Sequence, residues 1–146
     1  MIIRRGELDD LGAICAIERA SFGDPWSESD FRTAFGDPLC EYMIARDGAE
    51  VIGYGLFSVL YEDAEILSLA VDPARRRCGV GKEMLSRLVE RAREKKAERI
   101  FLEVRASNAS AIALYSGAGF KTVRTIKRYY RRPVEDAIAM SLELNV

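Results

Sequence analysis

The apolar residues of this chain recur with two spacings, which divide it into expected helices and strands. Over residues 8–21 they fall at Leu11, Ile14 and Ile17, as in a helix that buries one side, whereas residues 65–71 form an apolar run typical of a buried strand. The same patterns predict strands at about residues 2–5, 42–46, 51–60, 65–71, 99–105, 120–127 and 136–142, and helices at 8–21, 27–35, 79–96 and 108–117.

Turn and capping residues separate these elements. Asp47-Gly48 favours a hairpin, and Asp72-Pro73 ends a strand because proline lacks the N–H that a ladder needs. Ser27 followed by Asp30 resembles a capping box. The resulting order, β-α-α-β-β-β-α-β-α-β-β, predicts one α/β domain over residues 1–146. We expect a mixed, mostly antiparallel twisted sheet of about seven strands with helices on both faces.

Composition narrows the function. The net charge of −1 gives no overall basic field for nucleic acid, and no apolar run reaches the roughly 18 residues of a membrane span. The N-terminus lacks a signal-peptide layout, and three scattered cysteines favour a reducing compartment, so a cytoplasmic protein is expected. The absence of histidine removes the commonest metal ligand and general base, so we expect no metal.

The most distinctive motif, Arg76-x-x-Gly79-x-Gly81, joins the strand at 65–71 to the long helix. A glycine turn at a helix start directs backbone N–H groups and a partial positive charge at one point, which predicts a phosphate or pyrophosphate site. A P-loop does not fit, because Arg76 stands where that motif has its first glycine and Glu83 stands where it has Ser or Thr. A dinucleotide-binding fingerprint does not fit either, because Met84 stands in place of its third glycine. The alternative is a tight turn with solvated arginines. The candidate binding residues are Arg77, Cys78, Gly79, Val80, Gly81 and Lys82.

This loop resembles the pyrophosphate loop of the GCN5-related N-acetyltransferases (GNAT), which bind acetyl-CoA. Within that family, residues 102–115 with Gly119 and Phe120 resemble the LEVRxSNxxAxxLYxxxGF segment of RimI-type alanine N-acetyltransferases. Three further segments are similar: Pro25-Trp26-Ser27, Arg128-Tyr129-Tyr130 and residues 135–140. The resemblance covers nearly the whole chain, in order and at similar spacing.

The resemblance implies an acetyl-CoA-dependent enzyme that acetylates the N-terminal alanine of a small-subunit ribosomal protein. It also implies that the backbone of Leu69, Ala70 and Val71 holds the pantetheine arm and the thioester oxygen. Direct attack by the amine is expected, because no candidate nucleophile stands beside a strong base. The alternatives are an acceptor that is another protein N-terminus, a lysine or a small amine, and a non-catalytic acyl-CoA-binding subunit. Nucleic-acid binding through the basic and aromatic residues 127–132 is least favoured.

Two side chains are candidates for proton transfer. Glu103 lies midway along the strand at 99–105, which we expect to be covered on both faces, so that partial burial would make the carboxylate a better base. It could instead be a rim residue paired with Arg105 or Arg99. Tyr115 could donate a proton to the leaving thiolate or be a core anchor, and Asn108, on the same side of its helix, could cap that helix or hold the pantetheine arm. In RimI-type enzymes the matching glutamate is the general base and the matching tyrosine the general acid.

The acceptor is expected to enter beside aromatic residues on two loops, which hold Trp26 and the Tyr129-Tyr130 pair. In the family these loops flank the acceptor side of the sheet, and aromatic walls can hold an extended peptide. Trp26 could also be a core anchor. Cys78 is either a small loop side chain or a thiol that the helix N-terminus makes reactive.

Overall fold

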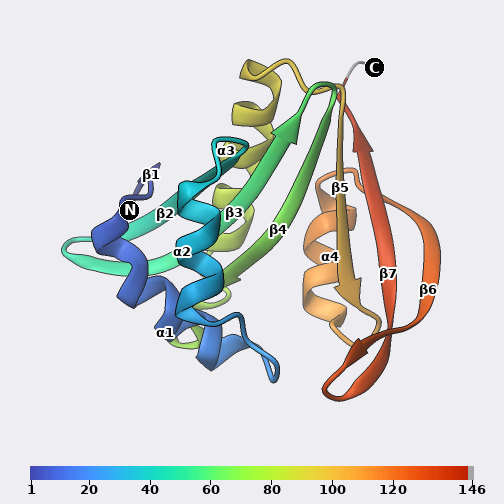
Figure 1. The fold of residues 1–146 in the computed structure, drawn as a ribbon, viewed down its shortest axis with the longest axis horizontal. Helices are drawn as coiled ribbons and strands as arrows, with labels where there is room; N and C mark the ends of the chain where they lie inside the picture. The colour runs from blue at the N-terminus through green and yellow to red at the C-terminus, as the bar shows by residue number, and fades with distance from the viewer. Residues whose placement is uncertain (145–146) are drawn as a thin grey trace.

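Seven strands form one open sheet in the order β1-β2-β3-β4-β5-β7-β6 (Figure 1). The computed structural model describes residues 1–144. All neighbouring strands are antiparallel except β4 and β5, which run parallel. The strands are β1 (Ile2–Arg5), β2 (Cys40–Asp47), β3 (Glu50–Leu60), β4 (Asp63–Val71), β5 (Arg99–Arg105), β6 (Lys121–Arg131) and β7 (Val134–Glu143).

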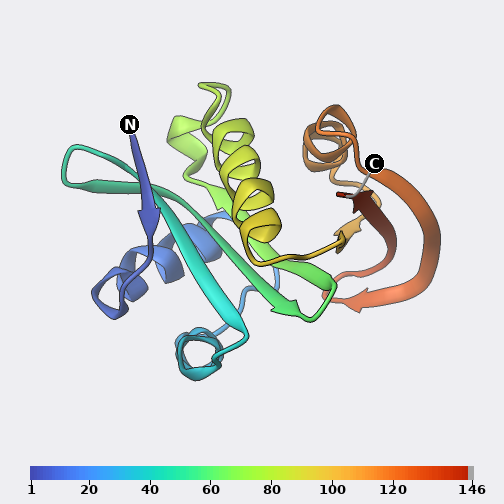
Figure 2. The same ribbon diagram turned by 90° about the horizontal axis from the view of Figure 1, so that it is seen from above.

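The helices cover both faces of the sheet (Figure 2). One face carries α1 (Leu11–Ser21), which follows a short 3-10 turn at Leu8–Asp10, and α2 (Glu28–Gly36). The other face carries α3 (Val80–Glu94) and α4 (Ala109–Gly117). None of the helices within residues 1–144 is long and apolar enough to cross a membrane.

Each helical layer has its own core. Under α1 and α2, fully buried residues such as Ile14, Phe31 and Tyr54 pack together. Under α3 and α4, the core includes Leu88 and Ile100. Because the sheet is apolar on both sides where it meets these helices, burial fixes the register of its central strands.

The predicted fold class and element order are confirmed. Ser27 caps α2 by a reciprocal capping box: its hydroxyl accepts from the Asp30 N–H at 3.1 Å, and its own N–H donates to the Asp30 carboxylate at 3.0 Å. The expected hairpin at Asp47-Gly48 joins β2 to β3, with Gly48 at a φ of +61°.

The sheet opens between β4 and β5. These strands pair only at Asp63–Arg99, Ala64–Ile100 and Glu65–Phe101 and then diverge, as Figure 1 shows. Beyond Glu65, β4 stays bonded to β3 as far as Val71, while β5 stays bonded to β7 as far as Arg105. The divergence therefore leaves one backbone edge of each strand free in the middle of the sheet.

The placement of Tyr129 and Tyr130 on a loop was wrong. Strand β6 continues to Arg131, and only Arg132 and Pro133, joined by a cis peptide bond, form the turn to β7. The register shifts between Ile126 and Tyr130. At this irregularity the Arg128 N–H donates to the Asp136 carboxylate at 3.0 Å, so a side chain replaces the missing ladder bond and pairing resumes at Tyr130.

Candidate active site

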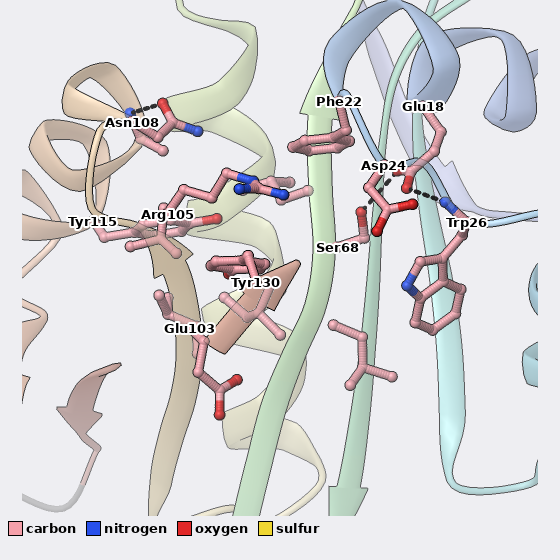
Figure 3. A pocket seen from close by; sticks show the side chains of 16 residues that line it. Glu18, Phe22, Asp24, Trp26, Ser68, Glu103, Arg105, Asn108, Tyr115 and Tyr130 are labelled. Carbon is pink, nitrogen blue, oxygen red and sulfur yellow. Dashed lines mark hydrogen bonds between the residues drawn. The ribbon is translucent and has the colours of Figure 1, made fainter. Parts of the chain in front are cut away.

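A cavity of about 190 Å³ lies at the opening between β4 and β5 (Figure 3). One wall comes from β5, β6 and α4, and the other from β4, the end of α1 and the segment after it. The lining residues are Leu102, Glu103, Val104, Arg105, Tyr130, Asn108, Ala111 and Tyr115 on the first wall, and Ile66, Leu67, Ser68, Leu69, Glu18, Phe22, Asp24 and Trp26 on the second.

Of the residues selected from the sequence, six line this cavity: Glu103, Tyr115, Asn108, Leu69, Trp26 and Tyr130. They come from β4, β5, β6 and α4, from the N-cap position just before α4 and from the segment after α1, so the fold collects them from distant parts of the chain. Ala70, Val71, Tyr129 and residues 77–82 lie outside the cavity lining.

Glu103 lies on the exposed side of β5. Burial alternates along this strand: Ile100, Leu102 and Val104 are buried, whereas Phe101 and Glu103 are exposed. The expectation that the strand is covered on both faces, and Glu103 partly buried, was therefore wrong. The helices α3 and α4 cover only one side of β5, and the divergence from β4 leaves the other side open.

The Glu103 carboxylate has no hydrogen bond or ion pair within residues 1–144. The arginines considered as its partners are engaged elsewhere: Arg105 pairs with Glu135 at 3.2 Å, and Arg99 with Asp63 at 2.8 Å. Glu65 on β4 lies close enough that its pKa is raised, first by loss of solvent and then by the negative charge of Glu103. Glu103 thus presents a free carboxylate at the edge of the cavity.

Tyr115 is 6% exposed and packs edge-on against Phe120, with ring centroids 5.6 Å apart. It also lines the cavity, so the core-anchor and active-site positions coincide. Burial, and secondarily Tyr130, raises the pKa of the Tyr115 phenol. The phenol therefore stays protonated at neutral pH, as a proton donor must.

Asn108 combines a capping position with a place in the cavity wall. Its side-chain oxygen accepts from the Ala111 N–H and from the Ser110 hydroxyl, both at 3.2 Å, and so caps α4. With its oxygen engaged in the cap, the amide nitrogen is the group left to meet a ligand.

The glycine loop has the backbone geometry that an anion site needs. Gly79 has a φ of +80° and Arg77 a φ of +65°, so the chain turns sharply before α3. The first helical bond runs from the Glu83 N–H to the Gly79 oxygen at 3.0 Å, which leaves the N–H groups of Val80, Gly81 and Lys82 without a helical acceptor.

Arg76 holds this loop against the rest of the fold. Its guanidinium donates to the Val71 oxygen at 3.2 Å and to the Ser21 hydroxyl at 3.1 Å, which ties the loop to the ends of β4 and α1. Cys78 is exposed, and its sulfur lies 3.7 Å from the Arg76 oxygen.

Aromatic side chains lie on both walls. The Arg105 guanidinium stacks 4.3 Å above the Tyr130 ring, and Tyr129 meets the same ring edge-on with centroids 5.0 Å apart. Burial, followed by nearby charges, raises the pKa of Tyr130 to about 12. On the opposite wall Trp26 packs against Phe31 at 5.3 Å, so it serves both the core and the cavity.

Sequence reasoning did not select the ten other lining residues, of which the polar and aromatic ones are Glu18, Phe22, Asp24, Ser68 and Arg105. Glu18 carried a signal, because it lies at helical spacing from Leu11 and Ile14 and so falls on the apolar side of its helix. A charged residue in that stripe is unusual and indicates a special role. The others depend on where β4 and β5 separate, which no local pattern indicates.

Comparison with known proteins shows the family of this chain. A family model described as "Acetyltransferase (GNAT) family" matches residues 11–120. The [ribosomal protein bS18]-alanine N-acetyltransferase of Escherichia coli K12 is 33% identical over 142 residues, which cover 96% of this chain and 95% of that protein. The N-alpha-acetyltransferase RimI of Mycobacterium tuberculosis is 36% identical over 121 residues, covering 80% and 75% of the two chains.

Solved structures show the same architecture. The crystal structure of the ribosomal-protein-S18-alanine N-acetyltransferase from Escherichia coli superposes with a TM-score of 0.92, at 31% identity, and covers 99% of this chain and 94% of that one. A protein of Salmonella typhimurium solved with its cofactor acetyl-CoA has the same fold, with a TM-score of 0.85, 24% identity and coverage of 100% and 95%.

Proposed function

Because the chain belongs to the GNAT acetyltransferase family and is an N-acetyltransferase, we propose that it transfers the acetyl group of acetyl-CoA to the N-terminal alanine of a small-subunit ribosomal protein. The observation that carries the proposal is the cavity between β4 and β5, which has a free carboxylate, Glu103, and a buried phenol, Tyr115, in its lining. A ribosomal acceptor would place the reaction in the cytoplasm.

The residues beside the cavity fit acetyl-CoA. The N–H groups of Val80, Gly81 and Lys82 at the start of α3 would receive the pyrophosphate, where the helix dipole favours negative charge. The edge of β4 from Leu69 to Val71, which has no partner in β5, would bond the pantetheine arm and polarise the thioester oxygen. A Cβ atom at Gly81 would lie 3.5 Å from Leu114, an ordinary contact distance, so the start of α3 lies alongside α4.

In the proposed reaction the acceptor enters as an ammonium group. Glu103 takes a proton from it, directly or through water, and the amine nitrogen attacks the thioester carbonyl carbon. The new C–N bond forms as the C–S bond breaks. Tyr115 then supplies the proton that the departing CoA thiolate needs. An α-amine has a reference pKa of about 8, so a weak base such as a carboxylate suffices.

Proximity supplies much of the remaining rate enhancement. The protein has no histidine, and the residues that line the cavity include no cysteine. Their one serine, Ser68, is bonded to Tyr54 and to the Glu18 carboxylate, which is too weak a base to make a serine hydroxyl a good nucleophile. Direct attack within a ternary complex is therefore the mechanism we propose.

The acceptor specificity can be tested with a peptide panel. The protein is incubated with acetyl-CoA and peptides that differ only in the first residue, and acetylation is followed by mass spectrometry. Peptides that begin with alanine should react fastest, because a small cavity excludes large first side chains by steric clash. Equal rates across the panel would reject the alanine assignment.

A further inference from the structure

Glu18 is a buried carboxylate that no cation neutralises within residues 1–144. Three carboxylate residues in this part of the chain are buried: Asp10, Glu18 and Glu41. Asp10 accepts two bonds from Arg4 at 2.9 and 3.0 Å, and Glu41 accepts two from Arg91 at 2.7 and 3.0 Å. Glu18, with only 3% of its surface exposed, is the most buried of the three.

Neutral donors hold the Glu18 carboxylate in place. One oxygen accepts from the Tyr54 hydroxyl and lies 3.2 Å from the Ser68 hydroxyl, while the other accepts from the Trp26 N–H at 2.9 Å. A carboxylate offers about four acceptor positions, so three donors leave one position open. These bonds orient the group but leave its negative charge uncompensated.

The position of Glu18 indicates where the missing cation belongs. Glu18 lines the cavity, and Figure 3 shows its carboxylate beside Asp24, Trp26 and Ser68 on the wall across from Glu103. A buried charge is costly unless it is paired, so an unpaired one beside a cavity is expected to have a partner in the ligand. Arg105 does not supply this partner, because it lies on the other wall and pairs with Glu135.

We propose that Glu18 selects the protonated form of the acceptor: its charge binds the α-ammonium group as the peptide N-terminus enters the cavity. This inference rests on the proposed function and adds to it the charge state in which the substrate binds. The ammonium group satisfies the buried carboxylate on entry, and Glu103 removes the proton only after binding.

The test compares two peptides that differ only in the functional group at the N-terminus. One begins with alanine, and the other carries a lactate residue in its place, so that a neutral hydroxyl replaces the ammonium. Their dissociation constants are measured by calorimetry on the full chain saturated with coenzyme A. The alanine peptide should bind at least about tenfold more tightly, a ratio that corresponds to about 1.4 kcal/mol.

A substitution at Glu18 tests whether the tighter binding of the alanine peptide depends on the charge of this residue. In Glu18→Gln, which keeps the side-chain volume and removes the charge, the ratio should fall to about threefold or less. Glu28→Gln is the matched control, because it makes the same chemical change at an exposed position on α2 outside the cavity lining, so the ratio should stay near the wild-type value.

Equal binding of the two peptides to the wild-type protein would overturn the inference without any variant, and so would an unchanged ratio in a folded Glu18→Gln protein. Failure of the proposed function looks different. In that case the wild-type protein would not acetylate the alanine peptide at all, and the two proposals would fall together. If acetylation proceeds but the binding ratio is near one, only the role of Glu18 is rejected.

Discussion

Glu65 and Phe101 form the last residue pair between β4 and β5. Two residues beyond Phe101 along β5, Glu103 reaches the cavity, and beyond Glu65 the β4 strand continues toward the glycine loop, paired with β3 and no longer with β5. The end of this short parallel ladder therefore determines where the unpaired edge of β4, the proposed cofactor edge, and the free Glu103 carboxylate face each other.

Replacing Glu103 by glutamine should slow acetyl transfer and remove the low-pH limb of the rate profile. The amide keeps the size of the side chain and cannot accept the proton. Because Glu103 is exposed and has no ion pair within residues 1–144, thermal stability should change little. A pH series of kcat/KM for both proteins measures the effect, and an unaltered profile would show that the carboxylate takes no part in proton transfer.

The same variant should lower the pKa of Glu65. Loss of solvent raises that pKa first, and the charge of Glu103 raises it further, so Glu103→Gln removes the second cause and leaves the first. NMR titration of the Glu65 carboxyl group in the two proteins gives the shift directly. A Glu65 pKa that does not fall would mean that the two carboxylates do not interact.

Tyr115→Phe should reduce kcat by about 100- to 10,000-fold, the usual contribution of a general acid. The ring that packs on Phe120 remains, so the fold and the affinity for acetyl-CoA should be nearly unchanged. Steady-state kinetics and calorimetry separate the two quantities. If kcat stays within twofold of wild type, Tyr115 only anchors the core.

Valine at Gly79 or Gly81 should weaken acetyl-CoA binding. At Gly79 the positive φ of +80° is strained for a β-branched residue, and at Gly81 the larger side chain would press on Leu114 and hinder close approach of the pyrophosphate. Gly36→Val, at the end of α2 and with open space around its Cβ position, is the control. Calorimetry with acetyl-CoA should show weaker binding for the two loop variants only, and equal affinities throughout would place the pyrophosphate elsewhere.

Acid should destabilise the protein partly through Glu41. Burial alone would raise its pKa, but the hydrogen bonds and charge of Arg91 outweigh burial and lower it below 4.5. A lowered carboxyl pKa gives stability that is complete above the unfolded-state value near 4.5 and is lost as the pH falls through the folded-state value. Urea unfolding at stepwise lower pH should show this loss.

Arg91→Met tests the assignment to this ion pair. The change leaves Glu41 buried and destabilises the protein, but by less than the roughly 3–5 kcal/mol of a fully buried pair, because the Arg91 side chain is 36% exposed and Lys95 stays 3.8 Å away. The acid-dependent loss should become smaller in this variant. The same acid dependence in both proteins would assign the effect to another carboxylate.

Much of the fold follows from local patterns in the sequence. The strand at Arg99–Arg105 and the alternation that separates Glu103 from Leu102 were predictable because each depends on near neighbours. The exposure of Glu103 was not, since it depends on β4 leaving β5. Strand β6 was predicted too short, because a run of basic residues before Pro133 is typical of a loop, while tyrosines also favour strands.

Glu103 and Tyr115, proposed here as the catalytic pair, and the glycine loop, proposed as the pyrophosphate site, were selected from the sequence by motif, whereas the cavity wall that carries Trp26 was selected only in part. Trp26 was selected as an aromatic residue near the acceptor, but the carboxylate that holds its backbone N–H was not. Glu18 lies on α1, before the segment that holds Trp26, and it contacts Tyr54 on β3 and Ser68 on β4, two strands far along the chain. Such a network exists only in the folded molecule.

The central claim, transfer to a peptide α-amine, is tested most directly by a pair of peptides. One begins with alanine and has a free N-terminus, and the other has the same sequence with a blocked N-terminus and an internal lysine. Initial rates of acetylation are measured by mass spectrometry at equal concentrations of peptide and acetyl-CoA. We predict that the alanine peptide is acetylated on its α-amine much faster than the lysine, and faster acetylation of the lysine would contradict the account.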